Sequence, residues 1–344
     1  MPVENLLIPQ SDFDEIAALI AAARQRAVQS VNTTLIELYW QVGQTISLKI
    51  EQAQWGDGVV AQLADHLART QPGLRGFTRP NLFRMRKFYE TYRQADSIVS
   101  ALLRQLPWTH NLIILNQSKH PEERTYYLRM AIRERWSSRE LERQFRTALF
   151  ERTMLSPAKP TQVLARTHPD ALNIFKDHYL VEFLDLPQGH LEIDLHQGLL
   201  RQLKNFLIEL GRDFCFVGSE YPLQVGGRDF ALDLLFFHRG LNCLVAIELK
   251  VGRFEPEYLG KLAFYLEALD RDVKKPHEAA AIGVLLCADK DQEVVEYALS
   301  RSLSPALIAA YQTQLPDKAL LQAKLHELFA QSAAANKTDQ DTVG

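Results

Sequence analysis

Charged residues stand within two otherwise apolar stretches of the chain, and they are the residues best suited to chemistry. Asp233 lies in the run 230–237, and Glu248 and Lys250 lie at the end of the run that starts at Leu241. Burying a charge without a partner is costly, so such residues need a partner or a function. Two carboxylates, with water and phosphate as further ligands, form a site for Mg²⁺, which prefers oxygen donors and keeps some of its water.

A metal ion held by Asp233 and Glu248 would have a clear chemical task. It would polarise a phosphate and lower the pKa of a bound water molecule. The ammonium group of Lys250 would orient the attacking water or neutralise charge in the transition state. These residues therefore predict hydrolysis of phosphodiester bonds with Mg²⁺, for which Mn²⁺ can substitute. The alternative is a salt-bridged cluster of the three side chains on the solvated face of a hairpin.

We expect the two stretches to form a hairpin with the two-residue loop Arg239-Gly240. In that register Asp233 lies opposite Ala246, and Glu248 is its diagonal neighbour on the same face. Lys250 projects from that face as well, because side chains alternate along a strand. Both carboxylates can then reach one cation.

The surrounding pattern indicates an α/β domain with a mixed sheet. We expect a helix over 195–210, stopped by Gly211, and then a strand over 214–225. A helix over 256–269 and a buried strand over 280–287 should follow the hairpin.

The first half of the chain has helical periodicity throughout. Two prolines in Ser156–Pro160 mark a linker. The predicted organisation is a helical domain over 1–155, the α/β domain over 156–335 and a disordered tail over 336–344.

Two short helices around the break Gln71-Pro72-Gly73 suggest a helix-turn-helix within the first domain. The second of them would present Asn81, Arg84 and Lys87 on one side to a nucleic-acid groove, with Arg86 beside them. The alternative is a packed bundle helix with a solvated basic face.

Charge is unevenly distributed along the chain, although the net charge is only −3. Between Arg69 and Arg146 there are sixteen Lys or Arg against seven Asp or Glu. Such an excess is typical of a surface that binds a polyanion, although a solvated helical face has the same composition. The absence of a long apolar run or a signal-peptide pattern predicts a cytoplasmic protein without membrane contact.

The spacing of the charged residues resembles that of a known nuclease superfamily. Asp233, fourteen intervening residues and then Glu248-Leu249-Lys250 resemble the PD-(D/E)xK signature, although Leu232 stands where the superfamily has a proline. The whole run 230–270 resembles, more narrowly, the YhcG family of PDDEXK nuclease-domain proteins. The first half resembles the helical domain of the same family, in Trp55-Gly56, in several positions between Gly76 and Tyr89, and in Gln105 to Trp108 with His110.

This resemblance implies roles for particular residues. Asp233 and Glu248 would bind the metal, and Lys250 would be the catalytic lysine. Superfamily members commonly add an acidic residue from the helix before the first strand, which implies Glu209 as a further catalytic residue and metal ligand, with Glu220 as its rival.

Related nucleases also often carry a Gln-x-x-x-Tyr pair on the helix after the lysine. The matching positions are Lys261 and Tyr265, which lie on one face of that helix. They would contact nucleic acid. The alternatives are a solvated lysine and a tyrosine that packs against the sheet.

The resemblance and the residues together predict a nuclease, and we expect a DNA endonuclease whose helical domain binds the substrate. The competing hypothesis is a nucleic-acid-binding or complex-assembly protein whose nuclease activity is weak or masked. Because cutting both strands commonly requires two active sites, a homodimer through the helical domain is the simpler arrangement.

Overall fold

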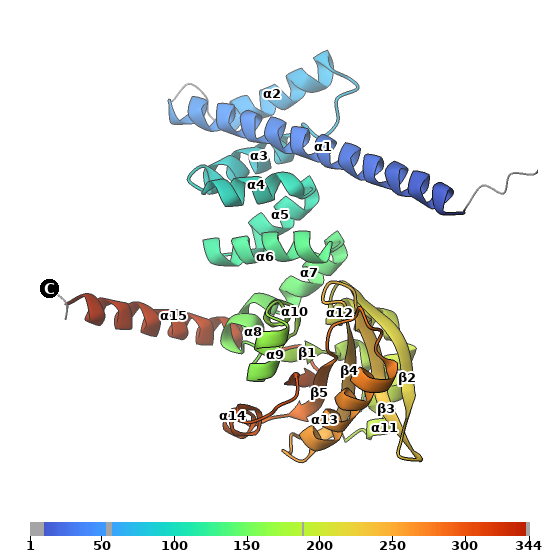
Figure 1. The fold of residues 1–344 in the computed structure, drawn as a ribbon. Coiled ribbons are helices and arrows are strands. Elements are labelled where there is room, and N and C mark those ends of the chain that lie inside the picture. Colours follow the sequence, from blue (N-terminus) through green and yellow to red (C-terminus); the bar gives the residue numbers. More distant parts are fainter. Residues whose placement is uncertain (1–9, 53–56, 188, 342–344) are drawn as a thin grey trace, which may run out of the picture. The chain divides into compact units, whose positions relative to one another are not determined.

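The computed structural model describes residues 10–52, 57–187 and 189–341, with side chains described from residue 30 to 330 except 53–57 and 188. The predicted turn at Trp55-Gly56 and the end of the predicted tail, 342–344, lie outside these residues. The chain forms two compact units that divide between Glu142 and Arg143 (Figure 1). We call them the helical unit and the sheet unit. No helix in the described residues is long and apolar enough to cross a membrane.

The helical unit confirms the prediction that the first half of the chain is helical. Its last helix, α7, starts in this unit and ends in the sheet unit. The helices are α1 (Gln10–Glu51), α2 (Asp57–Thr70), α3 (Arg79–Tyr92), α4 (Ser97–Gln105), α5 (Trp108–Gln117), α6 (Pro121–Glu134) and α7 (Ser138–Arg146).

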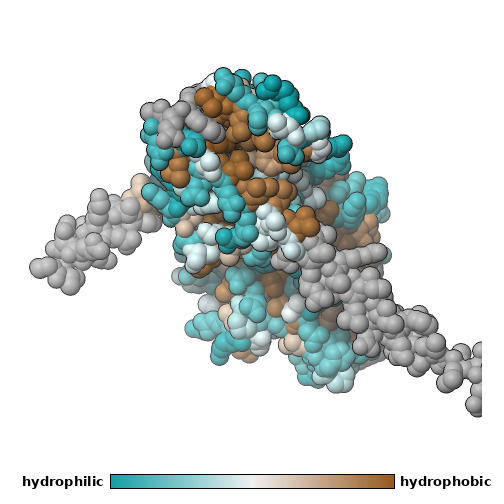
Figure 2. Space-filling view, turned by 90° about the horizontal axis from the view of Figure 1, so that it is seen from above, coloured by the Kyte–Doolittle hydropathy of each residue, from teal (hydrophilic) through white to brown (hydrophobic). Residues whose placement is uncertain are grey.

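The core of the helical unit forms where α3 packs on α1. Leu82, Met85 and Phe88 of α3 are fully buried, one helical turn apart, as expected for an amphipathic helix. A Cβ atom at Gly43 of α1 would lie 2.1 Å from the Met85 carbonyl oxygen, so the close approach of the two helices requires glycine there. Figure 2 looks onto this unit and shows apolar side chains exposed among hydrophilic ones.

Helices α2 and α3 pack together and are joined by residues 71–78, as the predicted helix-turn-helix requires. The break follows from Pro72 and Gly73, and α3 restarts after Thr78, whose backbone is extended. Pro80 lies in the first turn of α3, where its missing amide costs nothing. The arrangement fits the predicted motif, but its use in nucleic-acid binding depends on the surface of α3.

A six-stranded mixed sheet lies at the centre of the sheet unit and confirms the predicted fold class (Figure 1). Strands β2, β3 and β4 are antiparallel, while β4, β5, β6 and β1 are parallel, in the order β1-β6-β5-β4-β3-β2. The strands are β1 (His178–Leu180), β2 (Phe214–Val225), β3 (Arg228–His238), β4 (Cys243–Arg253), β5 (Ile282–Asp289) and β6 (Ala306–Gln312).

Both faces of this sheet are covered by helices, so the central strands are apolar on both sides. Helices α11 and α12 pack on the face that carries Val245, Ile247 and Leu249. Helices α13 and α14 pack on the opposite face, with Leu244 and Ala246. The helical elements of this unit are α8 (Leu149–Leu155), α9 (Gln162–Thr167), α10 (Ala171–Ile174), the 3₁₀ turn Glu182–Leu184, α11 (Glu192–Arg201), α12 (Leu203–Leu210), α13 (Tyr258–Ala268), the π-helical turn Leu269–Val273, α14 (Gln292–Ser300) and α15 (Lys318–Asp341).

The predicted register of the β3–β4 hairpin is wrong by two residues. His238 pairs with Cys243, so the loop has four residues, 239–242, and not two. Asn242 stabilises this longer loop: its backbone is left-handed, with φ of 51°, and its side chain donates a hydrogen bond to the carbonyl of His277. Because the shift is even, the predicted faces of the strands are retained.

Three further boundaries differ from the sequence prediction. The helix expected over 195–210 is two helices that meet at Gln202, whose backbone leaves the helical region. The units divide before Arg143 and not at residue 155, because α8 packs on α15 of the sheet unit. Helix α15 continues to Asp341, where a disordered tail was expected from residue 336.

Candidate active site

The structure brings Asp233 and Glu248 together at the end of the β3–β4 ladder. The last paired residues are Leu234 and Ile247, and one further step along that register places Asp233 opposite Glu248. Beyond the ladder, the backbone amide of Leu249 donates a hydrogen bond of 2.7 Å to Oδ2 of Asp233. A carboxylate thus takes the place of a strand carbonyl, which fixes the Asp233 side chain beside β4.

Glu248 is the most enclosed residue of the site, and its side chain is 0% exposed. Its Oε1 accepts hydrogen bonds from the ammonium groups of Lys250 and Lys261, at 3.2 and 2.5 Å. Its Oε2 is buried and has no hydrogen-bond partner among the described residues. Burial raises the pKa of Glu248, and the nearby charge of Asp233 raises it further, against the two lysines.

Lys250 occupies the centre of a small charged network. Its Nζ lies 3.2 Å from Oε1 of Glu248 and 3.1 Å from Oε1 of Glu192, and it donates to the Leu249 carbonyl at 2.6 Å. Burial by itself would lower the pKa of Lys250, but the two glutamates raise it above its usual value. The side chain is therefore a cation at neutral pH and not a proton acceptor.

Helix α13 brings Lys261 and Tyr265 to the same strand ends, one helical turn apart. Hydrogen bonding to Glu248 outweighs burial and raises the pKa of Lys261, whose side chain is 48% exposed and accessible to a ligand. Tyr265 is 2% exposed and donates a hydrogen bond to the Ala231 carbonyl at 2.9 Å. Its ring packs against the sheet, which is the alternative to the nucleic-acid contact predicted from the sequence.

The structure does not bring Glu209 to this site. Its carboxylate is fully buried, and it accepts from Arg143 at 3.0 Å, Lys176 at 3.2 Å and the backbone amide of Leu180 at 3.1 Å. The positive charge that compensates Glu209 at the end of α12 is therefore that of Arg143 and Lys176, and not that of a metal ion.

The rival residue, Glu220, lies on the far side of β3 from Glu248. The β2–β3 register runs from Ser219↔Leu234 to Tyr221↔Leu232, which places Glu220 opposite Asp233 on the neighbouring strand. Its backbone is left-handed, with φ of 46°, and it is exposed. In the described chain no group of three or more His, Cys, Asp or Glu residues is arranged to hold a metal. The candidate set is therefore the pair Asp233 and Glu248.

Two residues of helix α11 belong to the site and were not identified from the sequence. Glu192 contacts Lys250, and Nε2 of His196 lies 3.2 Å from the Asp233 carbonyl oxygen. The sequence pattern predicts the start of this helix at residue 195, which leaves Glu192 outside it, whereas α11 begins at Glu192. The Asp194 side chain accepts from the Leu191 amide at 2.9 Å, and this cap was the available signal for an earlier start.

The four residues of α3 that are predicted to contact nucleic acid differ in exposure and in hydrogen bonding. Asn81 is buried and bonds internally, accepting from Nε1 of Trp108 at 3.0 Å, so it is not available to a ligand. Arg86 pairs with Glu90 at 2.7 Å, and Lys87 donates to Asn116 at 3.3 Å. Arg84 is exposed and forms no ion pair or hydrogen bond through its side chain within the described residues.

Comparisons with known proteins match both halves of the chain. Residues 172–326 match the family model "YhcG PDDEXK nuclease domain", and residues 15–152 match "DUF1016 N-terminal domain". The Escherichia coli (strain K12) protein named "Putative nuclease YhcG" is 32% identical over 353 residues, which cover 92% of this chain and 93% of that protein. A crystal structure of a repair endonuclease from Pyrococcus abyssi matches 38% of this chain and 50% of its own, at 12% identity and a TM-score of 0.25, which is too low to support an argument.

Proposed function

The chain belongs to the YhcG family of PDDEXK nuclease-domain proteins, and from this premise we propose that it is a Mg²⁺-dependent endonuclease acting on DNA. The proposal depends on the burial and incomplete hydrogen bonding of the Glu248 side chain. Its carboxylate is fully buried, one of its oxygens has no partner among the described residues, and a second carboxylate lies beside it; this arrangement is costly unless a cation satisfies it.

The donor atoms fit a hard divalent cation. Asp233 and Glu248 offer only oxygen, and Mg²⁺ is bound in many phosphate-processing sites by one or two carboxylates together with water and the substrate phosphate. The two residues would hold the ion, which, when bound, would polarise the scissile phosphate and lower the pKa of a water molecule.

Lys250 would act on the reacting groups. Glu192 and Glu248 hold its ammonium group from two sides, which limits the positions that its Nζ can take. Because Lys250 stays protonated, it donates a hydrogen bond to the attacking water or to a phosphate oxygen, and it compensates the negative charge of the transition state. It does not remove the proton from the water.

Substrate binding is assigned to cations at the edge of the site and on the helical unit. The accessible ammonium group of Lys261 can contact a phosphate as a point charge. Arg84 and other exposed basic residues of the helical unit, between Arg69 and Arg139, would contact the backbone of the strand and release its counterions. We also retain the homodimer as a proposal, which sedimentation of the full chain tests directly.

The proposal is tested with the full chain in two measurements. The first is cleavage of plasmid, linear, branched and single-stranded DNA, and of RNA, with and without Mg²⁺ or Mn²⁺. The second is thermal unfolding, because a cation that binds only the folded chain raises its midpoint. We expect cleavage of DNA only with the cation, and a rise in midpoint that Asp233→Asn abolishes.

Asp229→Asn is the matched control, because Asp229 is on the same strand but its carboxylate pairs with Gln224 at the surface. That variant should cleave and respond to Mg²⁺ like the parent chain. If the cation leaves the midpoint unchanged and no substrate is cut, the proposal is overturned. Binding of nucleic acid without cleavage would instead support the binding or assembly protein with masked activity.

A further inference from the structure

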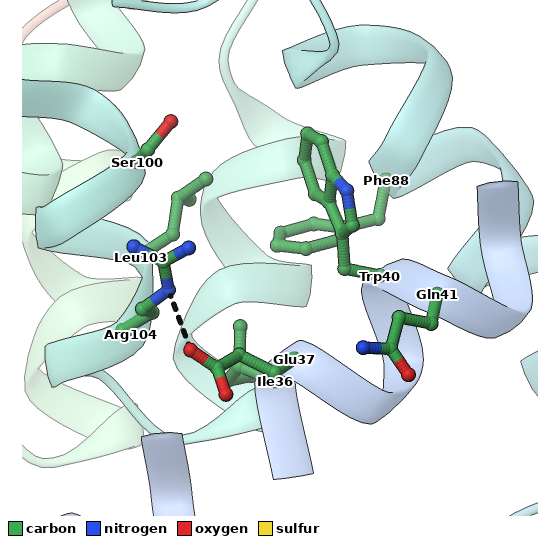
Figure 3. A pocket seen from close by; sticks show the side chains of 8 residues that line it. All are labelled: Ile36, Glu37, Trp40, Gln41, Phe88, Ser100, Leu103 and Arg104. Carbon is green, nitrogen blue, oxygen red and sulfur yellow. Dashed lines mark ion pairs between the residues drawn. The ribbon is translucent and has the colours of Figure 1, made fainter. Parts of the chain in front are cut away.

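A pocket lies between α1, α3 and α4 of the helical unit, and the nuclease chemistry does not use it. Its volume is about 420 Å³, within the range of sites that hold small ligands. Ile36, Phe88 and Leu103 are buried and form its apolar part, while Glu37, Trp40 and Arg104 also line it (Figure 3).

Trp40 provides a flat aromatic surface in this pocket. Its ring packs edge to face on Phe88, with centroids 6.0 Å apart, and on Tyr89, with centroids 5.1 Å apart. These two contacts hold the indole ring in place. A fixed aromatic ring at the edge of a cavity favours stacking on another flat ring, such as a nucleic-acid base.

The polar groups of the pocket offer both charges side by side. Nε of Arg104 lies 3.1 Å from Oε1 of Glu37, and each side chain is about half exposed. Figure 3 shows the other guanidinium nitrogens turned away from Glu37. The Ser100 hydroxyl and the Gln41 amide also line the pocket, and neither has a side-chain hydrogen bond within the described part of the chain.

We propose that this pocket binds an unpaired guanine base. A ligand that matches Arg104 and Glu37 has a hydrogen-bond acceptor next to hydrogen-bond donors. A ligand that stacks on Trp40 carries these groups on the edge of a flat ring. Guanine offers N1–H and N2–H₂ to the Glu37 carboxylate, O6 to the Arg104 guanidinium, and a double ring to Trp40. Adenine lacks the N1 proton, and cytosine offers the carboxylate one donor group and a smaller ring.

The guanine can come from a free nucleotide or from an unpaired position in a strand. Both sources use the same contacts, so the experiment separates them. The proposal concerns a second site and does not rest on the nuclease activity, because binding is measured in EDTA, where no divalent cation is present.

The test is titration of the full chain, followed by tryptophan fluorescence. The ligands are GMP, AMP and CMP, and short oligothymidines that carry one central guanine, adenine or cytosine. We expect quenching by the guanine ligands at concentrations at least tenfold lower than by the others, as roughly one bidentate contact provides.

Quenching should be lost in Trp40→Phe if the signal arises in the pocket. Binding of GMP as tight as that of the guanine oligothymidine identifies a nucleotide site, and tighter binding of the oligothymidine identifies a strand site.

Glu37→Gln should abolish the preference for guanine. Its control is Glu51→Gln, because Glu51 is also on α1, is 48% exposed and pairs with Arg93 on another helix at 2.7 Å, away from the pocket. Exposed ion pairs contribute little to stability, so both variants should unfold close to the parent midpoint. The proposal is overturned if no guanine ligand quenches, if Trp40→Phe keeps the signal, or if Glu37→Gln and Glu51→Gln bind guanine equally.

Discussion

Two fully buried glutamates in the sheet unit are held in opposite ways. Glu209, on α12, is surrounded by Arg143, Lys176 and a backbone amide, and Glu248, on β4, keeps one oxygen without a partner in the described chain. Burial alone would raise the pKa of both carboxyl groups. The pKa of Glu209 is nevertheless lowered by Lys176 and the arginines near it, while that of Glu248 is raised by burial and Asp233.

This difference shows why burial of a charged residue does not by itself indicate a functional site. Both carboxylate oxygens of Glu209 accept hydrogen bonds inside the fold, so this side chain contributes to stability. One oxygen of Glu248 has no partner in the described chain, and this is the oxygen that the proposed cation would use.

The largest expected effect is on the stability provided by Glu209. Glu209→Ala leaves the partly buried Lys176 and Arg143 with less opposite charge, so we expect the free energy of unfolding to fall by about 3–5 kcal/mol. Urea unfolding measures it. Glu182→Gln, which removes the other carboxylate next to Arg143, is the control and should cost less, because the Glu209 contact remains. Equal losses in the two variants would contradict the comparison.

The next effect is on catalysis. Lys250→Ala should reduce the rate of cleavage by roughly 10²–10³-fold at saturating substrate, since it removes charge stabilisation from the transition state. The rise in thermal midpoint with Mg²⁺ should persist, because Lys250 is not a ligand. A variant that cuts at the parental rate would show that Lys250 is only a salt-bridge partner.

The pH dependence of stability should have opposite signs for the two glutamates. A raised pKa means that the stability associated with Glu248 is present below its ordinary pKa of 4.5 and is lost as the pH rises through the raised value. A lowered pKa means that the contribution of Glu209 is present above 4.5 and is lost as the pH falls. Relative to the parent chain, Glu248→Gln should therefore become more stable as the pH rises above 4.5, whereas Glu209→Gln should become less stable as the pH rises toward 4.5 from below. Urea unfolding on both sides of pH 4.5 checks both variants, and slopes of the same sign would contradict the assignment.

The smallest expected effect is on the salt dependence of nucleic-acid binding, where two arginines of α3 that differ in their side-chain partners are compared. Arg84 has no side-chain partner in the described chain, whereas Arg86 pairs with Glu90. Arg84→Gln should reduce the slope of log affinity against log salt by about 0.9 for duplex DNA, and Arg86→Gln should change it less. Fluorescence anisotropy at several salt concentrations gives the slopes. No change in either variant would remove α3 from the nucleic-acid surface.

The sequence predicted strands β2 to β5, the mixed sheet and the meeting of Asp233 with Glu248, because these follow from local apolar patterns. It did not predict β1 or β6. It did not predict the register of the hairpin, since the loop is lengthened by Asn242, whose side chain bonds to a residue 35 positions away. The family resemblance implies Glu209 as a metal ligand, and the sequence does not reveal its actual partners, because Arg143 and Lys176 are 66 and 33 positions distant and no local pattern connects them. Asn81 was misassigned for a similar reason: its spacing fits an exposed face, but Trp108 covers it.

Helix α7 limits how this protein can be recombined with others. It starts in the helical unit, but Arg143 near its end is held by Glu182 and Glu209 of the sheet unit. If the helical unit were exchanged at the segment with two prolines after residue 155, α7 would be replaced together with it. The sheet unit would then lose Arg143, and Glu209 would lose that positive charge. The short break before α7, at Trp136 and Ser137, is the place where a different helical unit can be joined while this ion pair is kept. Natural shuffling of the helical unit among nucleases of this kind should therefore conserve the end of α7 together with the sheet.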